Sequence, residues 1–217
     1  MADTGSRAVV WDLPTRLFHW SIVVLVVFAW WTYKADHMEW HRAAGYAVLA
    51  LLAFRLFWGF FGATTARFAN FLRGPGAVWR YLRGRWPKAA GHNPLGGWSV
   101  AALLAVLIVQ PLLGLFASDE DGLDSGPLAD RVSYDQSQQA EHLHSVLFYV
   151  LVGLVAVHIA AIAFYRLRGD NLLLPMISGR AELPPGTTPP ARAPLWALAL
   201  GLILAAGVFA GLYRWGG

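Results

Sequence analysis

Long apolar segments alternate with shorter polar ones along the chain. Five segments have the roughly 20 mostly apolar residues that a helix needs to cross a bilayer core about 30 Å thick. They cover residues 17–33, 41–61, 95–117, 142–165 and 195–213. The first is rich in bulky aromatic residues and lacks a small-residue cleavage site, which argues against a cleaved signal peptide. The pattern predicts an all-α integral membrane protein with four transmembrane helices in a bundle and a fifth at the C-terminal end.

Basic and acidic residues are segregated between the connecting segments. Residues 62–94 carry five Arg and Lys88 without a single acid, whereas residues 118–141 carry seven acids and one Arg. Residues 166–194 add four more Arg. Because Lys and Arg are enriched in cytoplasmic connections, we expect both basic connections and the N-terminus to lie in the cytoplasm. The acidic connection and the C-terminus are then expected on the other side of the membrane.

A Pro-rich stretch separates the fifth apolar segment from the first four. Residues 182–194 read ELPPGTTPPARAP, a composition typical of an extended connection. We therefore expect a four-helix domain over residues 1–180, a cytoplasmic connection over 181–194 and an additional transmembrane helix over 195–217.

Composition narrows the chemistry that the chain can perform. It is 57% hydrophobic and only 14% charged, and its net charge of +4 resides between apolar runs, so a nucleic-acid partner is not expected. The sequence contains no Cys, which excludes disulfides, iron–sulfur clusters and covalently attached c-type haem. A redox centre would have to be held by His, Met, Tyr or carboxylate side chains.

Histidines recur inside the predicted spans, where an ionisable residue is by default a functional candidate. His144 and His158 share the fourth span and are separated by almost four turns, or about 21 Å, on nearly one face. His142 would point to nearly the opposite face. Given the expected topology, His19 lies at the depth of His158, and His41 lies at the depth of His144.

The four histidines form two pairs, each at one depth in the membrane, as the axial ligation of two b-type haems requires. The pairs are His19 with His158 and His41 with His144. A lone His inside a membrane is as often an interhelical hydrogen bond or a proton-relay member. Zinc or copper is less favoured, because no third ligand joins either pair. The pattern thus predicts two non-covalent haems with these four axial ligands.

Two further residues belong to the predicted cofactor sites. Arg55 lies 14 residues after His41 and is a candidate partner for a haem propionate, with snorkelling to the interface as the alternative. Gly45, one turn after His41, would leave room for a flat macrocycle, with simple helix packing as the alternative.

Several sequence motifs occur together in a recognisable order. They are WDLPTRLFHW from Trp11, WHRAAGYAVLALLAFRLFWGFFG from Trp40, GHNPLGG from Gly91, EHLHS around His144 and VHIAAI around His158. Over residues 8–180 the chain resembles the bacterial cytochrome b561 family, especially the b-type cytochrome subunit of nickel–iron hydrogenases. Members of this family generally have four spans, so the fifth helix departs from the pattern.

The resemblance implies a di-haem cytochrome in the bacterial inner membrane, with the same four histidines as ligands. It implies electron transfer between the quinone pool and a periplasmic redox protein, such as a hydrogenase subunit or a c-type cytochrome. His37 on one side, or His92 and Asn93 on the other, are candidate quinone contacts, although each could be a simple loop residue.

A second class of function is a stand-alone superoxide or quinone oxidoreductase, for which Lys34, His37 and Arg42 would supply positive charge near His41. The acidic segment 118–141 argues against attraction of an anion and is better suited to a cationic partner. A cofactor-free transporter would leave the paired histidines unexplained. The sequence leaves open whether the chain forms homo-oligomers.

Overall fold

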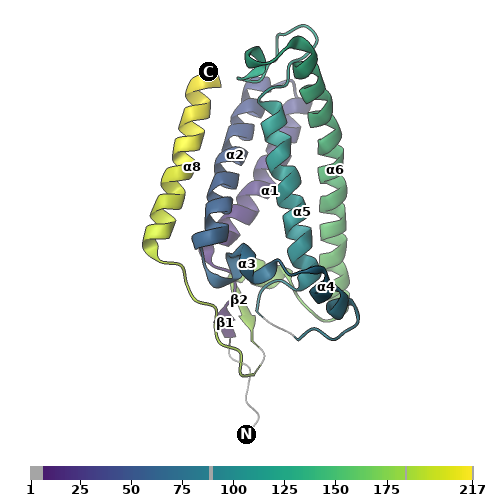
Figure 1. Ribbon diagram of the computed structural model, residues 1–217, viewed down its shortest axis with the longest axis vertical. Coiled ribbons are helices and arrows are strands. Elements are labelled where there is room, and N and C mark those ends of the chain that lie inside the picture. Colours follow the sequence, from purple (N-terminus) through teal and green to yellow (C-terminus); the bar gives the residue numbers. More distant parts are fainter. Residues whose placement is uncertain (1–6, 88–89, 184, 217) are drawn as a thin grey trace. The chain divides into compact units, whose positions relative to one another are not determined.

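Five long helices dominate the computed structural model, which describes residues 7–87, 90–183 and 185–216 (Figure 1). They are α1 (Leu13–Lys34), α2 (Met38–Phe61), α5 (Pro94–Gly114), α6 (Tyr134–Leu167) and α8 (Leu195–Gly216). All five are long and apolar enough to cross a membrane. The predicted all-α membrane fold is confirmed. Lys88 of the basic connection and residue 184 of the Pro-rich connection lie outside the described residues.

Local capping explains where two of these helices begin. The Asp12 carboxylate accepts a hydrogen bond from the Thr15 backbone N–H at 3.1 Å, at the start of α1. Helix α6 begins at Tyr134, well before the expected start at His142. Its first turn is closed by a reciprocal pair, in which Gln136 N–H donates to the Ser133 hydroxyl and Ser133 N–H donates to the Gln136 side chain.

Short elements fill the connections. They are η1 (Thr64–Ala66), α3 (Phe68–Phe71), α4 (Pro75–Leu82), η2 (Ala129–Arg131), α7 (Leu173–Ser178), β1 (Arg7–Val9) and β2 (Arg180–Glu182). The two strands pair antiparallel, with Arg7 opposite Glu182 and Val9 opposite Arg180. This small sheet is an addition to the helical fold that the sequence predicts.

The chain divides into two compact units, and each long helix contributes a segment to both. Unit one comprises Met1–Phe18, Arg55–Ala102 and Val155–Leu200, and unit two comprises His19–Phe54, Leu103–Leu154 and Gly201–Gly217. Within unit one, the strands and their neighbours enclose a small core of Val10, Trp11 and Leu183. Unit two contains the acidic connection and the segments of α1, α2, α5 and α6 that line a cavity of about 780 Å³.

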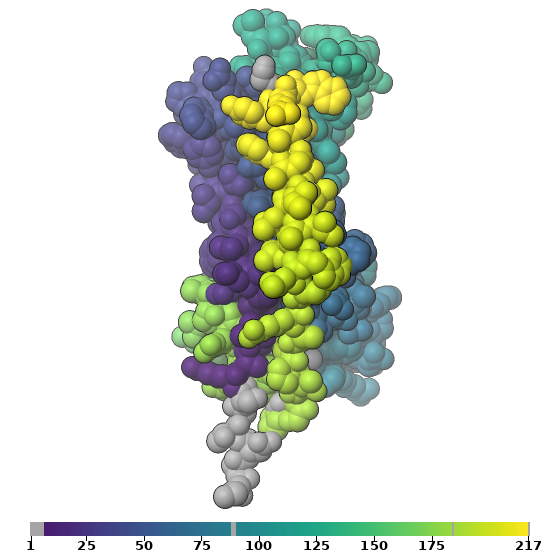
Figure 2. Space-filling model, turned by 90° about the vertical axis from the view of Figure 1, so that its left-hand side faces the viewer, coloured from purple at the N-terminus to yellow at the C-terminus, as the bar shows by residue number. Residues whose placement is uncertain are grey.

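Helix α8, which is yellow in Figure 2, carries many exposed apolar side chains. Leu202 and Ile203 are 55% and 67% exposed, and Leu195 is 84% exposed. Apolar surface on this scale is characteristic of a helix in contact with lipid or with another protein.

Candidate functional site

His41 of α2 and His144 of α6 face each other in unit two. Their ring centres are 6.1 Å apart and their ring planes are inclined by 84°. Two imidazoles on opposite sides of one metal ion, with metal–nitrogen bonds of about 2 Å, have ring centres roughly 6 Å apart. The spacing therefore suits a single ion held between the two rings. Of the two pairs that the sequence predicts, the structure places His41 and His144 side by side.

Backbone carbonyl groups fix the orientation of both rings. His41 Nδ1 lies 2.8 Å from the Ala29 carbonyl oxygen, and His144 Nδ1 lies 2.7 Å from the Gln110 carbonyl oxygen. An Nδ1–H that donates to a carbonyl leaves Nε2 as the nitrogen with a lone pair for a metal, and it also increases the basicity of the ring. Both histidines thus have the second contact that is typical of metal-ligating imidazoles.

A cavity of about 780 Å³ surrounds this pair and is lined only by residues of unit two. Ligand-binding cavities typically measure about 300–1,000 Å³. Gly45 lines the cavity, and a Cβ added there would meet nothing within 4 Å, so the predicted free space beside His41 is present. Tyr46 and Gln110 also line it, and the Tyr46 hydroxyl and Gln110 Oε1 are buried without a hydrogen-bond partner among the described residues.

Gly114 is a site residue that sequence reasoning missed. A Cβ added to it would lie 3.0 Å from His144 Cε1 and 3.2 Å from Nδ1, so a side chain here would press on the imidazole. The only feature in the sequence that could have pointed to Gly114 was the presence of a glycine near the end of an apolar span. Its proximity to His144 depends on the packing of α5 against α6 and has no counterpart in sequence spacing.

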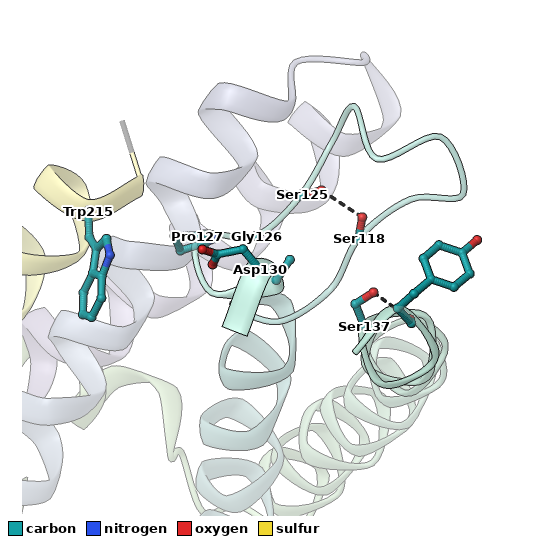
Figure 3. Close-up of a pocket in the computed structure, with 9 residues that line it drawn as sticks. Ser118, Ser125, Gly126, Pro127, Asp130, Ser137 and Trp215 are labelled. Carbon is teal, nitrogen blue, oxygen red and sulfur yellow. Dashed lines mark hydrogen bonds between the residues drawn. The ribbon is translucent and has the colours of Figure 1, made fainter. Parts of the chain in front are cut away.

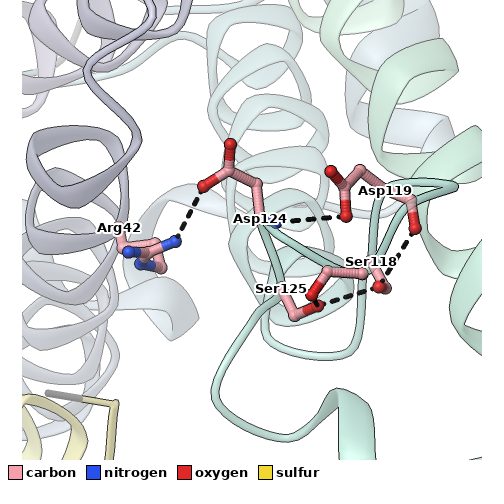
Figure 4. A network of polar contacts seen from close by, with 6 residues as sticks. Arg42, Ser118, Asp119, Asp124 and Ser125 are labelled. Carbon is pink, nitrogen blue, oxygen red and sulfur yellow. Dashed lines mark hydrogen bonds and ion pairs between the residues drawn. The ribbon is translucent and has the colours of Figure 1, made fainter.

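The acidic connection folds over the rim of the cavity (Figure 4). The Arg42 guanidinium lies 3.4 Å from an Asp124 carboxylate oxygen, and the Asp124 backbone N–H donates to Asp119 at 3.1 Å. The Ser118 and Ser125 hydroxyls are 2.8 Å apart and tie the two sides of the loop together. Arg42, next to His41 in the sequence, is therefore engaged by an acid of the loop.

A smaller pocket of about 490 Å³ lies beneath the same loop (Figure 3). Ser118 and Asp130 line it, and Trp215 from the end of α8 lines it from another side. The Arg131 guanidinium lies over the Trp215 ring at 5.7 Å from the ring centre. The fifth helix thus reaches the acidic connection.

Arg55 of α2 is deeply buried in unit one. Its side chain is 4% exposed, and its guanidinium lies 5.0 Å from the Phe68 ring centre and 6.0 Å from that of Phe71. Arg55 Nη1 has no hydrogen-bond partner among the residues that the structure describes. Snorkelling to water is therefore not the conformation found. A buried guanidinium nitrogen without an acceptor fits an anionic group such as a propionate.

His92 lies in the same cluster, between two aromatic rings. Its ring centre is 4.6 Å from Trp11 and 4.8 Å from Phe71. Burial first, and then the positive charge of Arg55 and the proximity of His158, together lower the pKa of His92 to about 3. His92 is thus neutral at physiological pH. His92 lies in the irregular segment between α4 and α5, and its ring packs inside unit one; a contact with quinone stays a prediction.

Asn93 joins Tyr81 of α4 to Tyr165, which lies near the end of α6. Its Nδ2 donates to the Tyr81 hydroxyl at 3.0 Å and to the Tyr165 hydroxyl at 3.1 Å, and the two hydroxyls also contact each other. Burial, and then the hydrogen bond with Tyr165, raise the pKa of Tyr81. Asn93 also lies in the irregular segment before α5, and a contact with quinone there stays a prediction.

The remaining histidines are distributed between the units. His19, in unit two, contacts the Trp20 ring with ring centres 4.8 Å apart, and His158 belongs to unit one. Pairing of these two stays a prediction from their positions in the sequence. His142 and His37 are exposed, and the exposure of His142 agrees with the helical-face argument that favoured His144.

Two neighbouring imidazoles, each with its Nδ1 against a backbone carbonyl group in one cavity of a helical membrane protein, are the features of a membrane protein that binds a metal-containing cofactor. Residues 10–179 match the family model of prokaryotic cytochrome b561, and the chain belongs to this family. It is therefore a b-type cytochrome, a membrane protein that carries electrons through haem b.

Curated relatives agree with this assignment. The chain is 27% identical over 186 positions to a protein from Azotobacter chroococcum mcd 1 and 28% identical over 186 positions to one from Azotobacter vinelandii. Both are described as a probable Ni/Fe-hydrogenase B-type cytochrome subunit, and each alignment covers 69% of this chain and 78% of the relative. No solved structure gives a significant match.

Proposed function

We propose that the protein is a di-haem cytochrome of the bacterial inner membrane that transfers electrons between quinone and a periplasmic redox protein. The observation that carries the proposal is the His41–His144 pair, with ring centres 6.1 Å apart. Each Nδ1 of this pair contacts a backbone carbonyl group, at 2.8 Å for His41 and 2.7 Å for His144. When bound, haem supplies a one-electron iron couple, and the chain holds, orients and shields it.

The four predicted histidines have distinct tasks in this proposal. His41 and His144 hold one haem, and His19 and His158 hold the other. Gly45 leaves space for the first macrocycle. Arg55 neutralises a propionate of the second haem, which would give its buried Nη1 the acceptor that the described residues do not supply.

Charge distribution supports the orientation of the molecule. The basic connection over residues 62–94 lies in the cytoplasm, and the acidic connection over residues 118–141 faces the periplasm. The N-terminus is then cytoplasmic and the C-terminus periplasmic. The four-helix domain ends near residue 180, residues 181–194 connect it to α8, and α8 is the additional span.

The partner is expected at the acidic face. The curated relatives bear the name of hydrogenase subunits, which favours a hydrogenase as the periplasmic partner. A basic c-type cytochrome is the other candidate, because the seven acids of residues 118–141 would attract it electrostatically.

Quinone is expected at the opposite, cytoplasmic side. A quinone requires a hydrogen-bond donor beside an apolar slot. Asn93 Nδ2 donates to the Tyr81 and Tyr165 hydroxyls, and because these two hydroxyls also contact each other, one hydroxyl proton remains for a quinone. His37, the rival candidate, is exposed and lies with its ring centre 6.3 Å from that of Trp31. Asn93→Ala should slow haem reduction by quinol at least tenfold and His37→Ala should not, because only the first removes a donor from an organised cluster. The reverse pattern would move the quinone to the periplasmic side.

A stand-alone superoxide or quinone oxidoreductase is the alternative function. It requires a cationic entrance beside His41, but the Arg42 guanidinium lies 3.4 Å from the Asp124 carboxylate. We therefore rank it second. Superoxide consumption by the purified protein without a partner would favour it.

Haem stoichiometry tests the proposal directly. The purified protein should contain two non-covalent haems per chain by pyridine haemochrome assay. His144→Ala should leave one haem, because one side of the pair is lost. His142→Ala, two residues away on the exposed face, is the matched control and should retain both. One haem or none in the wild-type protein, or loss of haem in the control alone, would contradict the assignment.

A further inference from the structure

Helix α4 is attached to the ends of two membrane-spanning helices in unit one. The Tyr81 hydroxyl contacts Tyr165, close to the end of α6, and accepts a hydrogen bond from Asn93, the residue before α5. Just before α4, the Arg73 carbonyl accepts a hydrogen bond from Trp98 Nε1 at 2.8 Å. Because α5 begins and α6 ends at these contacts, α4 lies at the level of the membrane boundary.

The two faces of α4 differ in their surroundings. Ala77 and Tyr81 are one turn apart, Ala77 is 7% exposed, and Tyr81 contacts the ends of α5 and α6. Trp79 is rotated from Tyr81 by about 200° around the helix axis. Trp79 is 57% exposed and Leu82 is 62% exposed. The face of α4 that points away from the helix ends is therefore apolar and uncovered.

Arginines border this apolar face. Arg80, Arg83 and Arg85 are exposed, and residues 62–94 contain no acid. Asp170, an acid from beyond α6 that acts on Tyr81 of α4, is accompanied there by Arg168. The Arg83 guanidinium lies 4.3 Å from the Trp79 ring centre, and that of Arg80 lies 5.6 Å from the Trp86 ring centre. Each cation is thus held beside an indole ring, at the edge of the apolar surface.

A short helix with tryptophan and leucine on its outer face and arginine at the rim has the composition of an element that lies in a membrane interface. We propose that α4 and the following turn bind the headgroups of anionic phospholipids in the adjacent leaflet. Trp79 and Leu82 enter the boundary between headgroups and acyl chains, and Arg80, Arg83 and Arg85 contact the phosphates.

The location of α4 favours lipid over a soluble acidic protein. Such a protein would neutralise the arginines, but it would have to cover an apolar face at the height where α5 and α6 emerge from the bilayer. A helix as short as α4 binds membranes weakly by itself, but attachment between two spans keeps its effective concentration at the surface high. The inference is independent of haem content and of the identity of the redox partner.

Lipid selectivity of the full-length holoprotein provides the first test. The protein is placed in nanodiscs containing phosphatidylcholine and spin-labelled phosphatidylglycerol, and the preference for the anionic lipid is measured by electron paramagnetic resonance. Arg80→Gln/Arg83→Gln should reduce the preference by up to about fivefold per charge at low salt. Arg180→Gln/Arg192→Gln removes two exposed charges elsewhere in unit one and should leave it unchanged. Equal losses in both variants, or no loss in the first, would overturn the proposal.

Depth measurement provides a second test, which the absence of Cys from the sequence makes simple. A spin label at Leu82→Cys should be more accessible to oxygen, which partitions into lipid, than to a water-soluble nickel chelate. A label at Leu123→Cys, where the native side chain is 83% exposed in the acidic connection, should show the opposite preference. If both labels behave as water-exposed, α4 does not enter the interface and its outer face belongs to a soluble partner.

Discussion

Gly114 provides a sharp test of the His41–His144 site, because a small change there acts directly on the His144 ring. A Cβ at this position would lie 3.0 Å from His144 Cε1, whereas ordinary contacts begin near 3.4 Å. The ring would have to move by about 0.4 Å, which would stretch its 2.7 Å contact with the Gln110 carbonyl oxygen to about 3.1 Å, near the limit for such a bond. Gly114→Ala should therefore shift the ring slightly and weaken its contact with the carbonyl group, without removing the ring from the site.

A larger side chain should remove the ligand from its position. Gly114→Val adds two more carbons, and overpacking of this kind costs about 1–3 kcal/mol. If that cost falls on the haem-bound state, haem affinity decreases by roughly 5- to 150-fold. We expect Gly114→Ala to keep two haems, with one altered low-spin signal in electron paramagnetic resonance, and Gly114→Val to lose one haem.

Gly153 of α6 supplies the matched control, because a Cβ there would meet nothing within 4 Å. Gly153→Ala and Gly153→Val make the same chemical changes in a helix of the same protein. They should leave both haem signals as in the wild type. The reasoning is refuted if Gly114→Val retains two unaltered haems, or if the Gly153 variants lose haem to the same extent.

Three further predictions follow from the buried charges and the expected topology. Arg55→Leu should lower the midpoint potential of one haem by on the order of 50 mV, since loss of a positive charge favours oxidised iron; redox titration with equal shifts at both haems would contradict this. The folded-state pKa of His92 is about 3, below the unfolded value near 6.5, so stability should be lost as pH falls from about 6.5 toward 3. By pH 5 the loss reaches about 2 kcal/mol, and His92→Phe should flatten this part of a chemical-denaturation profile. A periplasm-dependent reporter fused after Asp124 should be active, and activity of a cytoplasm-dependent reporter at that point would reverse the topology.

The spans could be predicted from the sequence because a membrane span requires about 20 consecutive, mostly apolar residues. This signal is local and does not depend on how the helices pack against each other. The early start of α6 could not be read from hydropathy, since residues 134–141 are mostly polar. A local signal was nevertheless present, because Ser133 and Gln136 have the spacing of a capping box. The small sheet between β1 and β2 had no such signal, since its strands are three residues long and 170 residues apart.

Helical spacing favoured His144 over His142 from the geometry of one helix alone, and the structure places His144 beside His41 and leaves His142 exposed. Helical spacing could not predict the contacts that orient the two imidazole rings. Ala29 and Gln110 act through backbone carbonyl oxygens, which every residue has, so no residue type marks them. The packing of His92 could not be predicted for a related reason: the segment GHNP has no regular structure before Pro94, and only tertiary contacts with Trp11 and Phe71 surround the ring.

The fifth helix is the part of the chain that the family does not explain, because the family match ends at residue 179. The end of this helix nevertheless contacts residues that line the candidate site. Trp215 lies beneath the Arg131 guanidinium and lines a pocket with Ser118, while a Cβ on Gly216 would overlap the Tyr46 hydroxyl. Tyr46 and Ser118 both line the His41–His144 cavity. The C-terminal end of α8 therefore packs against the residues that form the wall of that cavity and the root of its acidic loop, so α8 is structurally part of the site.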